Sequence, residues 1–509
     1  MRLGEARRLG EARRSDGALL RLGLAVLPGK LTQRVLLCLL LVACQSRDKE
    51  IPQRANREKG PIRQLLDNRE ERIRWHRDAR FGGMVHFTPD TIGKVVHYDA
   101  EHQPDPYRGR PIVAEEFDRY YTRMTLQNFD AEAWVSAFAD AGMKYFVFVA
   151  KHHNGFCMWD SKYTNYDIYA VTGRDVVAEL AEACKKHGIT FGLYYSIMDW
   201  YHPHATGITH GGRGYDLPPD IAPNIKNYIS YMNAQLRELT TKYGRIGLLW
   251  YDGAWMSEGI DDPNLQWTEK HARDLYEYSL QLQEGIITNN RMQRSHYKPT
   301  DKGDYYTPEN FIGNFDRDNH WESIMKLGVS WHWVPKEPIK QVEQIQAMLS
   351  RAVGNDGNLL LNIGPHPDGF IEPNQVEVLK QLGKWLDTNG EAVYGTRGGP
   401  YLPSKEVVST NKGSNVYLHL LDEGLRVLTV DSLDAKIESC TNMKGEPLSC
   451  EVMNDKLRIT LEENRPGVDV IRIAIDKNAL DVPLVKSGGE MRHSVDTEKK
   501  IVMENVKEE

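Results

Sequence analysis

Polar side chains follow directly after apolar stretches at three places in the sequence. The first stretch ends in His86, the second runs into His152 and His153, and the third ends in Asp252. Imidazoles can hold hydroxyl groups or move protons, and a carboxylate at the end of a buried strand is placed to act on a ligand. These residues alone predict a hydrolase or an isomerase, although an Asp-Gly pair such as Asp252-Gly253 is also a common turn.

Two histidines and an aspartate could instead hold zinc. Helical zinc ligands often come as a spaced His-Glu-x-x-His pair, and the sequence contains no such pair. Adjacent histidines such as His152 and His153 can also simply hydrogen-bond around the rim of a barrel. We therefore expect no metal and no cofactor.

Strand-like and helix-like stretches alternate over some 300 residues and would position these groups. The expected strands are 81–87, 144–150, 190–196, 245–251 and 285–288. The expected helices are 130–142, 173–188, 221–243 and 266–283. Near-continuous apolar strands separated by helices indicate a parallel sheet that is buried on both faces. We predict an α/β fold of the (β/α)8 barrel type, in which the active site forms at the carboxyl ends of the strands. A doubly wound sheet is the competing fold, but its glycine-rich phosphate turn is missing.

After residue 390 the pattern changes to short strands broken by Asn, Gly, Asp and Pro, which predicts a small antiparallel β-sandwich. The expected domains are a catalytic barrel over 69–392, a β-sandwich over 393–478 and a polar tail over 479–509.

The composition is that of an ordinary globular protein, with 40% hydrophobic and 27% charged residues. The net charge of -7 gives no electrostatic case for nucleic acid. Cys157 and Cys184 lie among core-type residues and are expected to be buried thiols. Cys440 and Cys450 could pair in an oxidising compartment or remain free.

The first 44 residues contain a basic repeat and then an apolar run, 35–43, that is too short to cross a bilayer. Such a run suits a secretory signal. The ending Leu41-Val42-Ala43-Cys44 resembles the lipobox of bacterial lipoproteins, in which the cysteine is lipidated; a plain signal peptide is the alternative. Residues 1–44 are thus expected to be a signal region with an over-extended start, and 45–68 a tether. The resemblance implies a periplasmic or outer-membrane-anchored lipoprotein that contacts the membrane only through its lipid.

The histidine-containing stretch is similar to the central motif of the family-twenty-nine glycoside hydrolases, the α-L-fucosidases. That stretch is Ala150-Lys151-His152-His153-Asn154-Gly155-Phe156-Cys157-Met158-Trp159-Asp160-Ser161. Further segments resemble other motifs of the family, in the same order: 192–196, 249–253, 289–291, 303–309 and 354–365. The resemblance extends over about residues 70–400. It implies a barrel followed by a β-sandwich, and a fucosylated oligosaccharide or glycoconjugate as substrate.

The resemblance also implies retaining hydrolysis by two carboxylates. Asp252 would be the nucleophile and Glu309 the general acid/base, in which case their carboxyl groups must lie about 5–5.5 Å apart. The Thr-Pro-Glu context favours Glu309 over its rivals, which are Glu322, Glu337 and Glu343. The residues expected to contact the sugar are His86, His152, His153, Tyr195, Trp250 and Arg291. Trp255, Trp331 and Trp333 could form part of the aglycone wall or belong to the core.

Some residues depart from the family pattern. Phe87-Thr88 stand where Trp-Gly is usual, Asn154 replaces an aspartate, and a Glu-Trp pair between the first two strands is missing. The alternatives are therefore a retaining glycosidase for a related sugar such as an α-L-galactoside, or a non-catalytic glycan-binding lipoprotein.

Overall fold

Seven parallel strands form the largest sheet of the computed structural model, in the order β5-β4-β3-β2-β1-β7-β6. The structure describes residues 62–92, 120–205, 222–257, 260–293, 298–461 and 467–487. The strands are β1 (Phe81–Val85), β2 (Tyr145–Lys151), β3 (Thr190–Ser196), β4 (Leu248–Asp252), β5 (Ile287–Thr288), β6 (Glu322–Lys326) and β7 (Asn358–Ile363). The parallel α/β domain confirms the predicted fold class.

Segment 304–309 connects the two edges of this sheet. On one side, Asp304 N donates to Thr288 O beside β5 (2.8 Å) and Asn289 is bridged to Tyr305. On the other side, Ile324 N of β6 donates to Pro308 O (2.9 Å) and Glu309 is bridged to Ile324. The seven strands and this irregular segment thus complete a ring of eight, as a (β/α)8 barrel requires.

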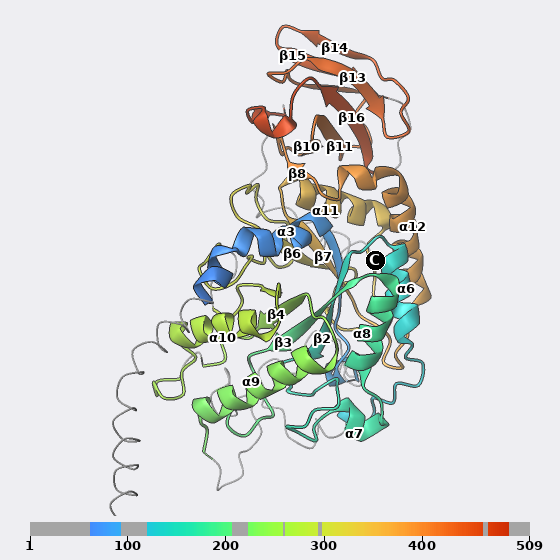
Figure 1. Ribbon diagram of the computed structural model, residues 1–509. Coiled ribbons are helices and arrows are strands. Elements are labelled where there is room, and N and C mark those ends of the chain that lie inside the picture. The colour runs from blue at the N-terminus through green and yellow to red at the C-terminus, as the bar shows by residue number, and fades with distance from the viewer. Residues whose placement is uncertain are drawn as a thin grey trace, which may run out of the picture. The chain divides into compact units, whose positions relative to one another are not determined.

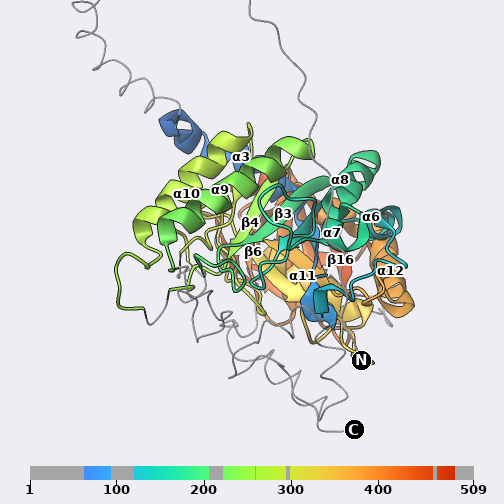
Figure 2. The ribbon, with the colours of Figure 1, turned by 90° about the horizontal axis from the view of Figure 1, so that it is seen from below.

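Helices surround the outside of the parallel strands (Figure 1). They are α3 (Arg69–Ala79), α6 (Ala131–Asp140), α7 (Ile168–Thr172), α8 (Val176–His187), α9 (Ile225–Lys242), α10 (Glu269–Leu282), α11 (Val342–Gly354) and α12 (Pro373–Asn389). Figures 1 and 2 show α9 and α10 next to each other on the side of the sheet that carries β3 and β4. In the described part of the chain, no helix is long and apolar enough to cross a membrane.

Local signals set the ends of these helices. The side chain of Asp175 accepts a hydrogen bond from Ala178 N and caps the start of α8, which ends at Gly188 in the left-handed conformation (φ 66°). Ile189 and β3 follow at once, so this turn delivers the chain directly into the next strand.

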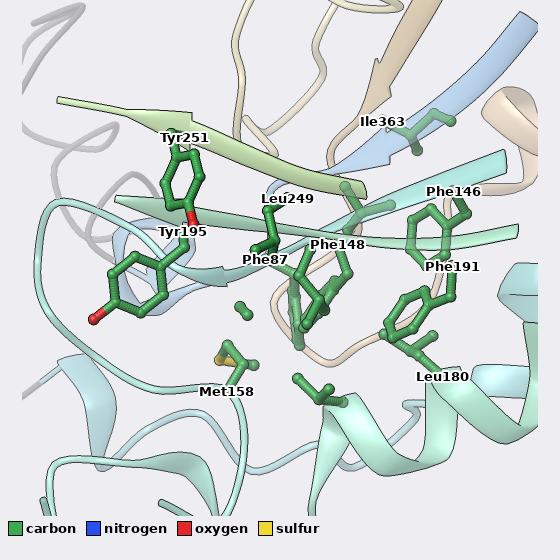
Figure 3. Packing of buried hydrophobic residues seen from close by; sticks show 14 of the residues in the cluster. Phe87, Phe146, Phe148, Met158, Leu180, Phe191, Tyr195, Leu249, Tyr251 and Ile363 are labelled. Atoms are coloured by element: carbon green, nitrogen blue, oxygen red, sulfur yellow. The ribbon is translucent and has the colours of Figure 1, made fainter. Parts of the chain in front are cut away.

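Side chains alternate between the two faces of each strand, which separates the barrel interior from the helix layer. Leu249 and Tyr251 of β4 belong to the large core under the helices, whereas Leu248 and Trp250 belong to the inner core. Figure 3 shows Phe146, Phe191 and Leu180 packed together in the outer core, and Tyr195 on the same side as Tyr251.

Antiparallel sheets follow the barrel and have their own core. A five-stranded sheet has the order β13-β16-β11-β10-β8, and a three-stranded sheet has the order β12-β15-β14. The strands are β8 (Arg397–Gly398), β9 (Tyr401–Leu402), β10 (Val407–Lys412), β11 (Asn415–Leu420), β12 (Val427–Asp431), β13 (Ile437–Asn442), β14 (Cys450–Met453), β15 (Lys456–Thr460), β16 (Asp469–Ile475) and β17 (Val485–Lys486).

Two features of this β domain bear on the sequence predictions. Cys440 of β13 and Cys450 of β14 form a disulfide, which joins the two sheets. The β domain extends beyond residue 478, where a polar tail was expected to begin. The 3-10 helix η3 (Ala479–Asp481) and β17 belong to this domain, because Ala479 and Val482 are buried in its core.

Candidate active site

Asp252 lies at the carboxyl end of β4 on the inner face of the barrel, next to Ser196 at the end of β3. Its Oδ2 accepts a hydrogen bond from the hydroxyl of Tyr194 (3.1 Å), and its Oδ1 lies 3.3 Å from Nη1 of Arg291. Nε2 of His153 is 3.9 Å from Oδ2. The carboxylate side chain is 13% exposed, so it is held from several sides and still reachable.

Glu309 reaches the same guanidinium from the segment that completes the barrel. Its Oε2 is 2.7 Å from Nη1 of Arg291, and its side chain is 27% exposed. Because one nitrogen contacts both carboxylates, the separation of Asp252 Oδ1 and Glu309 Oε2 cannot exceed the sum of the two distances, about 6 Å. A pair of carboxyl groups this close suits retention at about 5–5.5 Å and is too close for an inverting pair at ~6.5–9.5 Å.

Arg291 is itself fixed by its surroundings. Its side chain is 2% exposed, Nε donates to Thr307 Oγ1 (2.7 Å), and the guanidinium lies over the ring of Trp250, 4.5 Å from its centroid. Burial would lower the pKa of Arg291, but the carboxylates of Asp252 and Glu309 raise it above its ordinary value. The residue is therefore a permanent positive charge between the two acids.

Trp250, which the resemblance predicts to contact the sugar, is buried beneath Asp252. Its ring is 1% exposed, Tyr194 stacks on it at 5.4 Å, and its Nε1 donates to Glu322 (3.0 Å). Trp250 lies one inner-face position before Asp252 on β4, so it forms the layer beneath the carboxylate.

The rival glutamates lie elsewhere. Glu322 is fully buried inside the barrel and accepts hydrogen bonds from Trp250 and Tyr145. Glu337 accepts from the backbone of Val329 and Ser330. Glu343 is exposed in the first turn of α11. Of these four glutamates, Glu309 shares the Arg291 guanidinium with Asp252.

The three histidines expected to contact the sugar, His86, His152 and His153, lie beside Tyr194 and Asp252. The ring of His86 is 5.4 Å from that of His152, and the ring of His152 is 4.4 Å from that of His153. Burial lowers the pKa of His86 well below its ordinary value, and His332 and His152 act in the same direction. Burial and the neighbouring His152 likewise lower the pKa of His153 to about 3. His86 and His153 are therefore neutral and can accept or donate hydrogen bonds to hydroxyl groups.

Tyr195 does not belong to the site, and its neighbour Tyr194 takes the expected place. The hydroxyl of Tyr195 donates to Gln235 of α9 (2.7 Å) in the outer core (Figure 3). Burial and the Asp252 carboxylate raise the pKa of Tyr194 well above its ordinary value, so its hydroxyl stays protonated and donates to that carboxylate. Side chains alternate along β3, and Tyr194, which pairs with Trp250 of β4, lies on the inner face of the barrel.

Asp90 is a second residue that the sequence analysis missed. It is buried, and its Oδ2 accepts from His152 Nδ1 (3.1 Å) and from Asn154 Nδ2 (2.9 Å). Burial would raise the pKa of Asp90, but the hydrogen bond from His152 and the nearby imidazoles lower it, so the group is a carboxylate. No sequence motif marks Asp90, because Phe87-Thr88 interrupt the family pattern just before it.

Asp90, His152 and His332 also have the spacing of a metal site, since their ligand atoms lie within 4.8 Å of one another. However, hydrogen-bond donors already contact the Asp90 oxygen in that group, and His332 Nε2 lies 3.1 Å from Thr88 Oγ1. These contacts account for the cluster through hydrogen bonds.

The three tryptophans expected near the aglycone differ in position. The ring of Trp255 is 5.7 Å from that of His153, and the ring of Trp331 is 5.4 Å from that of His86. Trp333 instead contacts His366 and donates to Glu372 (3.0 Å). Trp255 and Trp331 therefore adjoin the site, and Trp333 packs behind it.

The sequence profile of the alpha-L-fucosidase family matches residues 50–391, which include both carboxylates and the three histidines. The chain belongs to the alpha-L-fucosidase family. It is 29% identical over 427 residues to the tissue alpha-L-fucosidase of Homo sapiens, covering 78% of this chain and 85% of the human one.

Two solved structures of alpha-L-fucosidases have the same fold. Isoenzyme 1 from Paenibacillus thiaminolyticus superposes with a TM-score of 0.69 at 27% identity, over 80% of this chain and all of that one. A family-twenty-nine alpha-L-fucosidase from Bacteroides thetaiotaomicron, trapped as a covalent intermediate, has a TM-score of 0.67 at 21% identity, over 80% of this chain and 96% of that one. Residues 1–61, with the predicted lipidation at Cys44, lie outside the described residues.

Proposed function

We propose that this alpha-L-fucosidase removes terminal α-L-fucosyl groups from glycans by double displacement, with Asp252 as nucleophile and Glu309 as general acid/base. The observation that carries the proposal is the shared contact of both carboxylates with Arg291 Nη1, at 3.3 and 2.7 Å. That contact limits the separation of the two carboxylate oxygens to about 6 Å, which supports a retaining pair.

In the first step, an Asp252 oxygen forms a bond to the anomeric carbon as the glycosidic bond breaks. Glu309 gives its proton to the departing oxygen, so the leaving group departs as an alcohol. In the second step, Glu309 takes a proton from water, the water oxygen bonds to the anomeric carbon, and the ester to Asp252 breaks. Glu309 regains its proton, and the sugar keeps its anomeric configuration.

The surroundings of Asp252 suit a carboxylate that must be ionised and correctly directed. Tyr194 and Arg291 engage one oxygen each, which fixes the plane of the carboxylate. Preorganised donors of this kind lower the cost of reorganisation when the bond forms. His86, His152 and His153 surround the same space and provide groups for the sugar hydroxyls.

An aryl α-L-fucoside tests the proposal directly. The parent protein should release the aryl group, Asp252→Ala should be inactive, and Glu309→Ala should recover activity in azide, because a small anion can replace the missing base. No release by the parent would exclude fucosidase activity, and release from an aryl α-L-galactoside alone would point to the related sugar. Full activity of Asp252→Ala would contradict the nucleophile assignment. Glycan binding without hydrolysis would indicate a binding protein.

We also propose that the protein is exported and held to the cell envelope by lipid on Cys44. The pattern of residues 35–44 supports this, and so does the Cys440–Cys450 disulfide, because disulfides persist in oxidising compartments. Cys44→Ser should release the protein from the membrane fraction in a cell that processes lipoproteins. Unchanged membrane association of that variant would exclude the anchor.

A further inference from the structure

The hydrogen bonds behind His86 determine which of its ring nitrogens carries the proton. Nδ1 of His86 lies 2.6 Å from Oδ1 of Asn362. The amide of Asn362 donates from Nδ2 to the carbonyl of Trp331 (2.8 Å), which can only accept, so the amide orientation is fixed. Oδ1 must then accept from His86, and the proton of the neutral ring lies on Nδ1. Nε2 is left with its lone pair.

A serine determines the proton position in His153. Nδ1 of His153 lies 2.6 Å from Oγ of Ser196, and the same Oγ donates to the carbonyl of Met198 (2.7 Å). A hydroxyl has one proton to donate. Because that proton is directed to a carbonyl, Oγ must accept from His153 Nδ1. Nε2 of His153 therefore has the lone pair, and it faces Oδ2 of Asp252 across 3.9 Å.

A carboxylate plays the same part for His152. Asp90 Oδ2 lies 3.1 Å from Nδ1 and also accepts from Asn154. The amide of Asn154 is oriented in turn, since its Oδ1 accepts from Phe156 N (2.9 Å). An ionised carboxylate only accepts, so His152 must donate from Nδ1.

We infer that Asn362, Asp90 and Ser196 are positioning residues that each accept a hydrogen bond from Nδ1 of a pocket histidine. In His86 and His153 this leaves the lone pair on Nε2, where it can accept a hydrogen bond from a ligand that offers hydroxyl protons. This inference rests on the proposed function for the identity of the ligand. The tautomers of His86 and His153 follow from their hydrogen bonds and from the neutral state of both rings, and need no ligand.

The arrangement has a consequence for specificity. Two facing acceptors, such as His153 Nε2 and Asp252 Oδ2, repel each other unless a donor lies between them. A sugar with free hydroxyls supplies such donors. A ligand in which those hydroxyls are methylated or missing leaves buried acceptors unpaired and should bind roughly 10- to 100-fold more weakly for each lost contact.

The tautomers can be observed directly in the purified protein labelled with ¹⁵N at histidine. In a neutral imidazole the protonated and unprotonated nitrogens have well-separated ¹⁵N shifts. We expect a protonated Nδ1 in all three histidines and the unprotonated shift at Nε2 of His86 and His153, with signals assigned by their loss in His86→Gln, His152→Gln and His153→Gln. In the parent protein, a proton on Nε2 of His86 or His153, or an unprotonated Nδ1 in any of the three, would overturn the assignment for that residue.

Variants of the partners separate positioning from a purely structural effect. Ser196→Ala should give His153 a mixture of tautomers and weaken L-fucose binding roughly tenfold, while the signals of His86 stay unchanged. Ser196→Thr, which keeps the hydroxyl, should restore the single tautomer. Ser279→Ala is the matched control, since Ser279 is a buried serine that contacts Tyr251 in the outer core. A single Nδ1–H tautomer in Ser196→Ala would overturn the role of Ser196.

Adding Zn²⁺ alone tests whether Asp90, His152 and His332 instead form a metal site. We expect no change at His152 or His332 at stoichiometric Zn²⁺. Specific shifts of both signals that disappear in Asp90→Asn would identify a metal site and overturn the positioning role of Asp90. Because the spectra are recorded without substrate, correct tautomers in a protein that hydrolyses no fucoside would refute the proposed function and leave this inference standing.

Discussion

The hydroxyl of Tyr194 lies 3.1 Å from Oδ2 of Asp252, and the two residues come from neighbouring strands of the barrel. Tyr194 is opposite Trp250 in the β3–β4 register, so it sits one inner-face position before Ser196, the residue opposite Asp252. The ring of Tyr194 stacks on Trp250 at 5.4 Å, and its hydroxyl thus reaches up to the carboxylate. One strand therefore orients the carboxylate that the next strand presents.

Tyr194→Phe should lower kcat on an aryl α-L-fucoside roughly 10- to 100-fold. The change removes one hydrogen bond to an ionised carboxylate, and such bonds contribute about 1.5–3 kcal/mol. The ring remains, so the stacking on Trp250 and the fold should be retained. Steady-state kinetics and a thermal melt of the same preparation measure both effects.

Tyr195→Phe is the control for that variant, because it removes a hydroxyl from the adjacent residue on the opposite face. It should lose the hydrogen bond to Gln235 and about 1 kcal/mol of stability, with kcat unchanged. Equal losses of kcat in the two variants would contradict the assignment of Tyr194 to the site.

The first five strands of the barrel and the helices between them could be predicted from the sequence because their apolar patterns are strong, whereas β6 and β7 were not predicted as strands. Strand 190–196 and the helix that ends near Gly188 lie where the pattern put them. The segment that carries Glu309 was not recognised as part of the barrel, since it holds a proline and pairs through isolated bridges rather than a regular ladder. Its motif still identified the glutamate, although only the fold brings residue 309 to residue 252.

The errors in the predicted site residues have a common cause. A resemblance to family motifs identifies the position of a residue in the chain and says nothing of the face on which it lies. Tyr195 was chosen over Tyr194 for this reason, although its hydroxyl lies in the outer core and donates to Gln235. Asp90 was missed because its role depends on His152 and Asn154, which come from a different strand end.

Arg291→Lys should reduce kcat/KM about a hundredfold. The guanidinium contacts Asp252 and Glu309 and donates from Nε to Thr307, and an ammonium group cannot reproduce this fork. Arg77→Lys is the matched control, because Arg77 pairs with an exposed glutamate on α3 and should leave kcat/KM unchanged. A near-parental kcat/KM for Arg291→Lys would show that a single positive charge is sufficient.

Glu337→Gln should remove a pH dependence of stability between about pH 4.5 and 6. Burial raises the pKa of Glu337 to about 6, against two backbone hydrogen bonds that lower it. A carboxyl group whose pKa is higher in the folded state binds more protons there, so its contribution to stability is complete below pH 4.5 and is lost as the pH rises through 6. The contribution is at most about 2 kcal/mol.

Thermal melts of the parent and Glu337→Gln from pH 4 to 7 measure this contribution. The Tm of the parent relative to the variant should fall as the pH rises through that window. Glu377→Gln, at an exposed position on α12, should melt in parallel with the parent at every pH. A constant difference between the parent and Glu337→Gln would exclude titration of Glu337 as the cause.

Asp356→Asn should cost about 3 kcal/mol of unfolding free energy without changing kcat. Asp356 is buried and contacts Arg80 Nη2 at 2.7 Å and Arg397 Nη2 at 2.6 Å, so it joins the barrel to the first strand of the β domain. Loss of its charge leaves the fully buried Arg80 without this counter-ion, and an uncompensated buried charge strongly destabilises the folded state.

The activity should survive that loss because of where the pair lies. Arg80 precedes β1 and Asp356 precedes β7, so both are at the amino ends of the strands, whereas Asp252 is at a carboxyl end. In this fold, residues at the amino ends serve stability and those at the carboxyl ends serve chemistry. Urea unfolding measures the loss of unfolding free energy, and kinetics at 25 °C measure kcat. Asp387→Asn, at an exposed position, is the control for both measurements. A large fall in kcat at a temperature where Asp356→Asn remains folded would show that the β domain acts on the site through this contact.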